Sequence, residues 1–407
     1  MTRAGSVERT RAPRLQGSMN PSVRTFPSGG GTCVEEHADC AELYPWYADV
    51  ASSEYVRRVT HTTAVVLASR PTGEPIHENF RLEARDLPAL EEGQVLLRTI
   101  YLSLDPYMRG RMNAGRSYAR ATELGEVMEG GTVCEVLESA SAMFAPGDIV
   151  LAHVGWQTHA VQNADLLRAI DPGRAPISTA LGILGMPGFA AWVGLTEIGR
   201  PQPGETLVVA AATGPVGSMV GQIARLQGAR TVGVAGGPDK VAWMRELGFN
   251  AALDHRAPTF VEDLGAAVPD GIDIYFENVG GAVWEAVFPH LNDFARVPVC
   301  GLVSQYNETR PPAGPDRSHL LMSAINTRRL LVRGFTQRDF GATHYGRFQR
   351  DVSTWFAEGR LKYREDVVEG IENAVDAFLG LLEGRNFGKL LVRVSEDPTT
   401  GEPSTEA

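Results

Sequence analysis

The chain has 407 residues, of which 43% are hydrophobic and 21% charged, and its formal net charge is −11. This composition is typical of a soluble globular protein with about two domains, and the acidic balance argues against an extended nucleic-acid surface. No apolar run approaches the ~20 residues that a membrane helix needs. The four cysteines are too scattered to predict a disulfide framework, so we expect a reducing, cytoplasmic location.

Residues 1–57 lack the pattern of a core and are predicted to be a disordered extension. The first thirty residues carry five arginines and one acidic residue, a bias that organelle transit peptides share. Prolines interrupt any amphipathic helix there, which favours a disordered tail or a start codon placed too early, with Met19 as the alternative initiator. Cys33, His37 and Cys40 form only a weak metal-binding pattern.

Residues 58–184 are predicted to form a β-rich, barrel-type domain. The strand-like runs are TTAVVLAS, GQVLLRTIYLSL, GTVCEVLE and GDIVLAHVGWQTHAV. They are rich in valine, isoleucine and leucine, and turn-forming residues separate them. Short runs of this kind are typical of the strands of a barrel or sandwich.

Residues 185–340 instead alternate buried strands with helices. ETLVVAAA, ARTVGVAG, GIDIYFENVG and ARVPVCGLVS are strand-like, whereas GSMVGQIARLQG and DKVAWMRELG have helical spacing. This alternation predicts an α/β domain with a doubly wound parallel sheet of the Rossmann type. Residues 341–395 add two amphipathic helices and a closing strand, and residues 396–407 form a polar tail.

A glycine-rich turn in the α/β domain indicates a nucleotide site. Within AAATGPVGSMVGQ, Gly214, Gly217 and Gly221 follow a predicted strand and open a helix. Gly214 is expected to permit the tight turn, and Gly217 to let the backbone approach a pyrophosphate at the helix N-terminus. Gly221 is expected to let the helix pack closely on the sheet. The spacing differs from GxGxxG, so a small-residue turn without a ligand stays an alternative.

The end of the next predicted strand indicates which nucleotide binds. In NAD-binding domains this strand usually ends in an acidic residue that accepts hydrogen bonds from the ribose, but here it ends at Gly236 and Gly237. Lys240, His255 and Arg256 follow and could bind a 2′-phosphate. The pattern favours NADP(H) over NAD(H), although a solvated Lys240 in the first turn of a helix would look the same.

Seven segments carry a family resemblance over about residues 58–395. They are YLSLDPYMRGRM, GMPGFAAWVGL, AATGPVG, AGGPDK, FENVGG, PVCGLVSQYN and NFGK. Together and in this order they resemble the zinc-independent medium-chain dehydrogenases/reductases, in the group of leukotriene B4 dehydrogenase/prostaglandin reductase, plant double-bond reductases and bacterial curcumin reductase. The resemblance implies a GroES-like catalytic domain completed by C-terminal segments, a Rossmann domain between them, NADP(H) as cofactor and a homodimer.

The resemblance also implies positions for the cofactor contacts. The pyrophosphate and 2′-phosphate contacts are expected at Thr213, Gly214, Pro215, Val216, Gly217, Gly236, Lys240, His255 and Arg256. The nicotinamide is expected beside Asn278, Cys300, Gly301, Leu302, Val303, Ser304, Gln305 and Asn307, with Asn386 closing over it. Two residues depart from the family pattern. His255 replaces a frequent tyrosine and could make NADP affinity sensitive to pH, and Ala190 replaces a frequent threonine near the expected nicotinamide.

The lack of a zinc-binding pattern in the sequence narrows the reactions that the protein is expected to catalyse. The Gly-His-Glu stretch and the cysteine lobe of zinc-dependent relatives are absent from the sequence, so direct reduction of a ketone to an alcohol is disfavoured. Reduction of a C=C bond conjugated to a carbonyl needs a hydride at the β-carbon and a hydrogen-bond donor at the enolate oxygen. Tyr306 is the expected donor, with packing at a domain seam as its alternative role. Asn307 is expected to orient the cofactor or Tyr306, and Tyr107 to line the substrate pocket or the core.

Three functions follow from these residues. The leading hypothesis is NADPH-dependent reduction of a small enal or enone. Quinone reduction would use the same cofactor geometry, and a non-catalytic NADP-binding protein would keep the glycine-rich turn alone. Retention of Tyr306 and Asn307 beside an intact turn weighs against the last of these.

Overall fold

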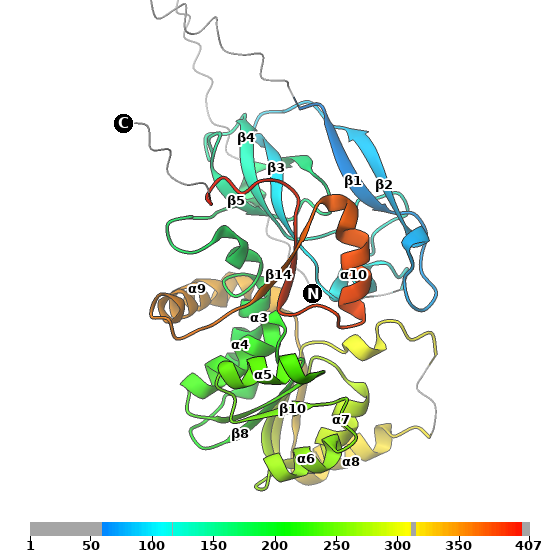
Figure 1. Ribbon diagram of the computed structural model, residues 1–407, viewed down its shortest axis with the longest axis vertical. Helices are drawn as coiled ribbons and strands as arrows, with labels where there is room; N and C mark the ends of the chain where they lie inside the picture. Colours follow the sequence, from blue (N-terminus) through cyan, green and yellow to red (C-terminus); the bar gives the residue numbers. More distant parts are fainter. Residues whose placement is uncertain (1–58, 116, 311–314, 401–407) are drawn as a thin grey trace, which may run out of the picture. The chain divides into compact units, whose positions relative to one another are not determined.

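The computed structural model describes residues 59–115, 117–310 and 315–400 (Figure 1). The predictions for 1–57, for the alternative initiator and for the cysteine–histidine pattern therefore lie outside the described residues. None of the helices in the described part combines the length and the apolar composition needed to cross a bilayer.

A six-stranded parallel sheet forms the centre of the α/β domain. Its strands are β8 (Thr206–Ala210), β9 (Arg230–Ala235), β10 (Ala251–Asp254), β11 (Ile272–Phe276), β12 (Leu291–Val299) and β13 (Leu331–Gly334). They lie in the order β10-β9-β8-β11-β12-β13, and each neighbouring pair is parallel. This confirms the predicted doubly wound fold, in which the sheet order reverses direction between β8 and β11.

Helices cover both faces of this sheet (Figure 1). Leu207 and Val209 of β8 face one core cluster, and Val208 and Ala210 face the other. The first cluster includes α3 (Met186–Gly194), α4 (Pro215–Leu226), α5 (Pro238–Glu246) and α9 (Gly341–Ala357), and the second includes α6 (Phe260–Ala267), α7 (Gly281–Val287) and α8 (Ser318–Arg328). Because β8 is buried on both faces, its sequence is a continuous apolar run without alternation.

The β-rich domain contains a seven-stranded sheet and a two-stranded one. The larger sheet consists of β3 (Gln94–Ser103), β4 (Thr132–Ser139), β5 (Ile149–Ala152), β6 (His159–Asn163), β7 (Arg168–Ala169), β14 (Glu365–Glu369) and β15 (Lys389–Arg393), and the smaller of β1 (His61–Leu67) and β2 (Phe80–Asp86). The predicted run GDIVLAHVGWQTHAV becomes two strands. Gly155 breaks it at φ 80°, where a Cβ would lie 2.5 Å from the carbonyl oxygen of Met128.

The stretch 341–395 contributes to both the β-rich domain and the α/β domain. β15 pairs with β3, and β14 pairs with β15, so these strands extend the β-rich sheet. α10 (Ala374–Leu382) packs beside them through Phe378, which contacts Trp156 edge-on. In contrast, α9 packs on α3 in the core of the α/β domain.

A buried ion pair connects the last strand to the start of the helix that carries Tyr107. Lys389 Nζ lies 2.8 Å from Asp105 Oδ1 and also donates to the carbonyl oxygen of Leu104, and both charged side chains are almost fully buried. The Ser103 hydroxyl donates to the other oxygen of Asp105. Asp105 lies just before α2 (Tyr107–Arg111), so β15 fixes where this short helix begins.

Candidate active site

The turn between β8 and α4 is shaped by Ala211 and Gly217. The positive φ of this turn falls on Ala211, at 53°, whereas Gly214 has φ −72°. The expectation that Gly214 permits the tight turn therefore differs from the structure, since the conformational demand lies on Ala211. Gly217 is required by proximity, because a Cβ there would lie 2.3 Å from the carbonyl oxygen of Ala211. A Cβ at Gly221 would meet the ring of Phe249 at 2.0 Å, so Gly221 makes room for that ring and not for a strand.

The N-terminus of α4 offers free backbone amides. Gly214 is the N-cap residue, Pro215 follows at the first helical position, and no side chain caps the helix. Within the described residues, the amides of Val216 and Gly217 have no hydrogen-bond acceptor. Thr213, in the turn before the helix, is 5% exposed. Such an uncapped helix end suits a pyrophosphate, which would accept from the amides and interact favourably with the helix dipole.

Three cationic or titratable side chains converge at the ends of β9 and β10. A Cβ at Gly236 would lie 2.7 Å from Arg256 Nε and 2.9 Å from His255 Nε2, so both side chains lie over this glycine. Lys240, in the first turn of α5, donates from Nζ to the carbonyl oxygen of Gly384 at 2.8 Å. Burial, and then the charge of Arg256, lowers the pKa of both Lys240 and His255. A bound phosphate would offset this repulsion.

The Asp254 carboxylate lies near this cluster and was not predicted as part of the site from the sequence. Its oxygen accepts a hydrogen bond from the Arg256 amide at 2.9 Å, and the Gly237 amide is the main cause of its lowered pKa. The carboxylate thus holds the turns after β9 and β10 together. The hydrogen bonds from backbone amides keep the Asp254 carboxylate ionised and occupied.

The ends of β11 and β12 are joined by a network around Glu277. The buried Glu277 side chain accepts hydrogen bonds from the amides of Val279 and Gly280 at 2.7 and 2.8 Å, and burial raises its pKa. Its carbonyl oxygen accepts from the amide of Cys300 at 2.9 Å. Asn278 Nδ2 donates to the carbonyl oxygen of Ala210 at 2.9 Å, across to the end of β8. The sheet edge where the order reverses is therefore rigidly bonded.

The segment from Cys300 to Tyr306 follows this edge. The Val303 and Ser304 amides donate to the carbonyl oxygens of Asn278 and Val279 at 3.2 and 3.0 Å. Gln305 Nε2 would lie 3.3 Å from a Cβ at Gly280, which brings this segment against the turn after β11. Burial raises the pKa of the Cys300 thiol to about 12, so this group stays neutral.

The Tyr306 hydroxyl lies over Gly301. A Cβ on Gly301 would be 3.1 Å from this oxygen, so only a glycine leaves it unhindered. Burial raises the pKa of Tyr306, with Tyr118 and Cys300 acting in the same direction, while the Leu302 amide and Arg111 oppose the shift. Tyr306 is therefore a neutral phenol at pH 7 and can donate a hydrogen bond.

The β-rich domain contributes a buried arginine between two tyrosines. The Arg111 guanidinium lies 5.4 Å from the ring centroid of Tyr107 and 4.4 Å from that of Tyr118. Its Nε donates to Glu129 at 2.7 Å, and the residue is 1% exposed. Burial raises the pKa of Tyr107. Arg111, Tyr118 and Glu129 were not predicted from the sequence, because no local pattern distinguishes a buried arginine in YMRGRM from a solvated one or points to its partners.

Asn307 has a different partner from the expected one. Its Oδ1 accepts a hydrogen bond from Arg109 Nε at 3.0 Å, and Arg109 also donates to Asn113 and to the carbonyl oxygen of Gly73. Arg109 is 3% exposed. Asn307 therefore connects the loop that carries Tyr306 to α2, and its side-chain oxygen does not point to Tyr306.

Asn386 lies in a turn that contacts the Lys240 side chain. Its Nδ2 donates to the carbonyl oxygen of Gly388 at 2.9 Å, and Gly384 of the same turn accepts from Lys240. Ala190 is buried in α3. The predicted cofactor residues thus come together along one edge of the parallel sheet, from Arg256 to Tyr306.

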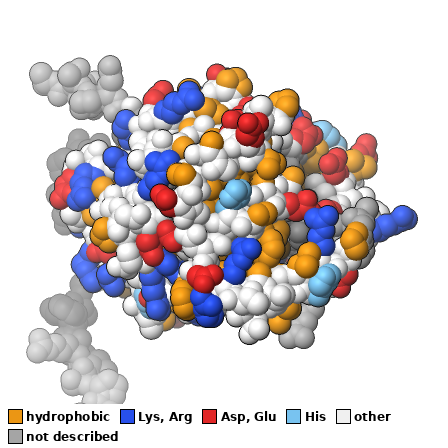
Figure 2. Space-filling view, turned by 90° about the horizontal axis from the view of Figure 1, so that it is seen from below, with side chains coloured by type: hydrophobic (Ala, Val, Ile, Leu, Met, Phe, Trp, Pro, Cys, Tyr) orange, Lys and Arg blue, Asp and Glu red, His pale blue; other side chains and the backbone are white. Residues whose placement is uncertain are grey.

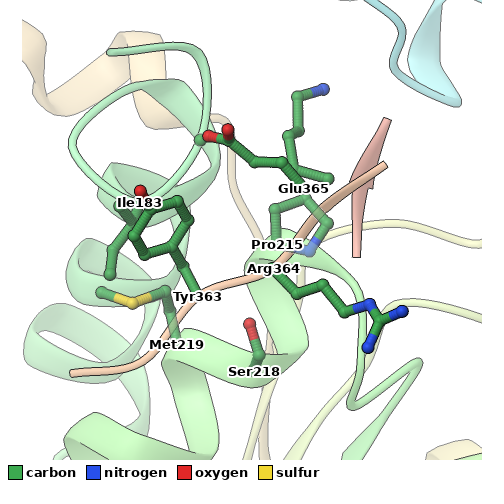
Figure 3. Close-up of a pocket in the computed structure, with 9 residues that line it drawn as sticks. Ile183, Pro215, Ser218, Met219, Tyr363, Arg364 and Glu365 are labelled. Carbon is green, nitrogen blue, oxygen red and sulfur yellow. The ribbon is translucent and has the colours of Figure 1, made fainter. Parts of the chain in front are cut away.

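A small cavity lies where the segment before β14 meets α4 (Figure 3). Pro215, Ser218, Met219, Tyr363, Arg364 and Glu365 line it, together with Gly182, Ile183 and Lys389. One carboxyl oxygen of Glu365 accepts from Ser178 at 2.8 Å, while the other is buried and has no partner in the described part of the chain. Burial raises the pKa of Glu365.

Comparisons with known proteins identify the family. A model described as the N-terminal domain of oxidoreductase matches residues 63–170, and one described as zinc-binding dehydrogenase matches residues 215–355. NADPH-dependent curcumin reductase of Escherichia coli is 53% identical, over 82% of this chain and 96% of its own. Prostaglandin reductase 1 of Bos taurus is 38% identical, over 82% of this chain and 100% of its own. The chain belongs to the zinc-independent medium-chain dehydrogenases/reductases.

A solved structure of the same family supports the assignment. CurA from Vibrio vulnificus in complex with NADPH matches this medium-chain dehydrogenase/reductase with a TM-score of 0.79 and 51% identity, covering 82% of this chain and 100% of the other. The protein is therefore an oxidoreductase of this family. Across residues 59–400, as far as they are described, no group of three or more histidine, cysteine, aspartate or glutamate side chains is placed to hold a metal ion.

Proposed function

We propose that this protein reduces the C=C bond of an α,β-unsaturated aldehyde or ketone with NADPH. The observation that carries the proposal is the neutral Tyr306 hydroxyl over Gly301, at the same sheet edge as the uncapped N-terminus of α4. The relatives named NADPH-dependent curcumin reductase and prostaglandin reductase 1 support it. Activity would not need a metal ion.

The residues at the sheet edge fit NADPH. The amides of Val216 and Gly217 would bind the pyrophosphate, and Lys240, His255 and Arg256 would bind the 2′-phosphate. Gly236 and Gly237 follow directly after β9, where an acidic residue would repel this phosphate, and the Asp254 carboxylate is occupied by hydrogen bonds from backbone amides. When bound, NADPH supplies the hydride for the β-carbon of the substrate.

The protein's own groups would stabilise the charge that develops on the substrate. Tyr306 would donate a hydrogen bond to the carbonyl oxygen, and this bond strengthens as the oxygen gains negative charge. The bond between Arg109 and Asn307 would hold the Tyr306 loop against α2. A proton from solvent, passed directly or through Tyr306, would complete the reaction at the α-carbon.

Isotope labelling tests the reaction. With an enone substrate and NADPH deuterated at the transferred position, we expect deuterium at the β-carbon, and in D₂O we expect deuterium at the α-carbon. The same enzyme is then offered a quinone. Turnover of the quinone without turnover of enones or enals would favour quinone reduction, and NADPH binding without turnover of either acceptor would favour a non-catalytic protein.

We further propose that the partners are small molecules and a second copy of this chain. β13 lies at the edge of the parallel sheet, with Leu331 45% exposed and the nearby Phe294 60% exposed. On the face drawn in Figure 2, acidic and basic side chains are interspersed, an arrangement that does not favour nucleic acid. Light scattering after size-exclusion chromatography should give the mass of a dimer, and Leu331→Lys should shift it toward the monomer. The cytoplasmic location stays a prediction.

A further inference from the structure

Arg364 differs from the other arginines near the end of the chain. Arg360, Arg385 and Arg393 are each paired with a carboxylate, at 3.1, 2.9 and 2.6 Å. Arg364 is exposed, and within the described residues its guanidinium makes neither a hydrogen bond nor an ion pair. An arginine that is placed by the fold but left without an anion is suited to bind one from outside.

The fold holds this guanidinium in one place. Its central carbon lies 3.8 Å from the ring centroid of Phe387, a cation–π contact. The Lys389 amide donates to the carbonyl oxygen of Arg364 at 2.9 Å, and the Phe387 amide donates to Asp366 at 3.0 Å. The backbones around both residues are therefore fixed to each other, and the aromatic ring supports one face of the guanidinium.

The guanidinium lies beside the uncapped end of α4. Arg364, Pro215 and Ser218 line the same cavity. In Figure 3 the Arg364 side chain extends past Pro215 and away from Tyr363, beside the first turn of α4. Since Pro215 has no N–H, the amides of Val216 and Gly217 are the hydrogen-bond donors at the positive end of the helix. The Arg364 guanidinium adds a positive charge beside them.

We propose that Arg364 binds the pyrophosphate of NADPH together with the N-terminus of α4, with Phe387 as the support for its guanidinium. This inference rests on the proposed use of NADPH. Arginine can bind phosphate oxygens through two parallel N–H groups, which lysine cannot. The role differs from that of Lys240, which lies at the ends of β9 and β10 with His255 and Arg256, because a pyrophosphate contact does not depend on the 2′-phosphate.

Binding measurements without substrate distinguish the two roles. The ligands are NADPH, NADH and 2′-AMP, which has a 2′-phosphate but no pyrophosphate, and the readout is calorimetry or quenching of tryptophan fluorescence. Arg364→Gln should weaken NADPH and NADH by a similar factor, roughly tenfold or more, and leave 2′-AMP unchanged. Lys240→Ala should weaken NADPH and 2′-AMP but not NADH. Arg360→Gln, an exposed and paired arginine nearby, is the matched control and should change none of them.

Two further variants, which change the site less, distinguish a lost contact from a misfolded protein. Arg364→Lys retains the charge without the planar fork and should recover only part of the affinity, and Phe387→Leu should show a smaller loss with the same ligand pattern. Unchanged NADPH affinity in Arg364→Gln would overturn the proposal. So would a loss confined to NADPH and 2′-AMP, which would mean a 2′-phosphate contact. Absence of enone turnover would contradict the proposed reaction but would not affect these binding results. Failure of the unaltered protein to bind NADPH would contradict the proposal that NADPH is the cofactor.

Discussion

At the scale of single residues, the chemistry depends on groups whose charge state is set by burial. Tyr306 is kept as a phenol by its surroundings, and Gly301 leaves room for its hydroxyl. The type and position of Tyr306 were predictable from PVCGLVSQYN. The buried Arg111 and Arg109, in contrast, were not, because a charged residue is buried only when partners distant in sequence, here Glu129 and Asn307, satisfy it.

Replacing Tyr306 by phenylalanine should reduce kcat with an enone by roughly 10²-fold and leave the KM for NADPH little changed. The hydroxyl would act on charge that develops in the transition state, whereas the ring still fills its space. Single-turnover hydride transfer is the direct measurement. An unchanged rate would make Tyr306 a packing residue.

NADPH affinity should rise as the pH falls from about 8 to about 6. Burial and Arg256 hold the pKa of His255 below its usual value in the free protein, so the ring is neutral at pH 7. A bound 2′-phosphate would raise this pKa and favour the imidazolium, so binding takes up a proton. Because the phosphate itself titrates in this range, the informative quantity is the difference from His255→Gln. Identical pH profiles for the two proteins would exclude His255.

At the scale of elements, the spacing of hydrophobic residues predicted strands and helices correctly where other elements bury them evenly. The runs assigned to β8, β9 and α4 became those elements, because a strand buried on both faces must be apolar throughout. The turns were harder to predict. The positive φ of the turn after β8 lies on Ala211 and not on a glycine. The single predicted run around Gly155 forms two strands, because the backbone of Met128 approaches Gly155 closely and the chain bends there.

The loop after β9 should discriminate between the two nicotinamide cofactors. Lys240→Ala should raise the KM for NADPH about ten- to hundredfold and barely affect NADH, since the contact would be a charge-assisted hydrogen bond to the 2′-phosphate. Steady-state kinetics with both cofactors measure this. Equal losses would instead assign Lys240 to its contact with Gly384, which positions the turn of Asn386.

At the scale of the whole molecule, stability should depend on the buried pair of Lys389 and Asp105. Lys389→Met leaves an unpaired carboxylate and should lower the free energy of unfolding by about 3–5 kcal/mol. Urea denaturation at pH 7 measures the loss. The double variant with Asp105→Leu should lose less than Lys389→Met alone, because no buried charge is then left unpaired. A larger loss in the double variant would mean that packing, and not charge, dominates here.

The pairing of β15 with β3 has a consequence for how the protein is made. Leu391 lies opposite Ser103, so the β-rich sheet cannot close until almost the whole chain has left the ribosome. The parallel sheet from β8 to β13 is continuous in sequence and needs no later strand. The nucleotide-binding half should therefore fold first, although it is synthesised second, and the earlier strands must wait with an open edge. Ribosome-bound chains that stop before residue 389 should then protect the parallel sheet from proteolysis and leave β3 open to cleavage.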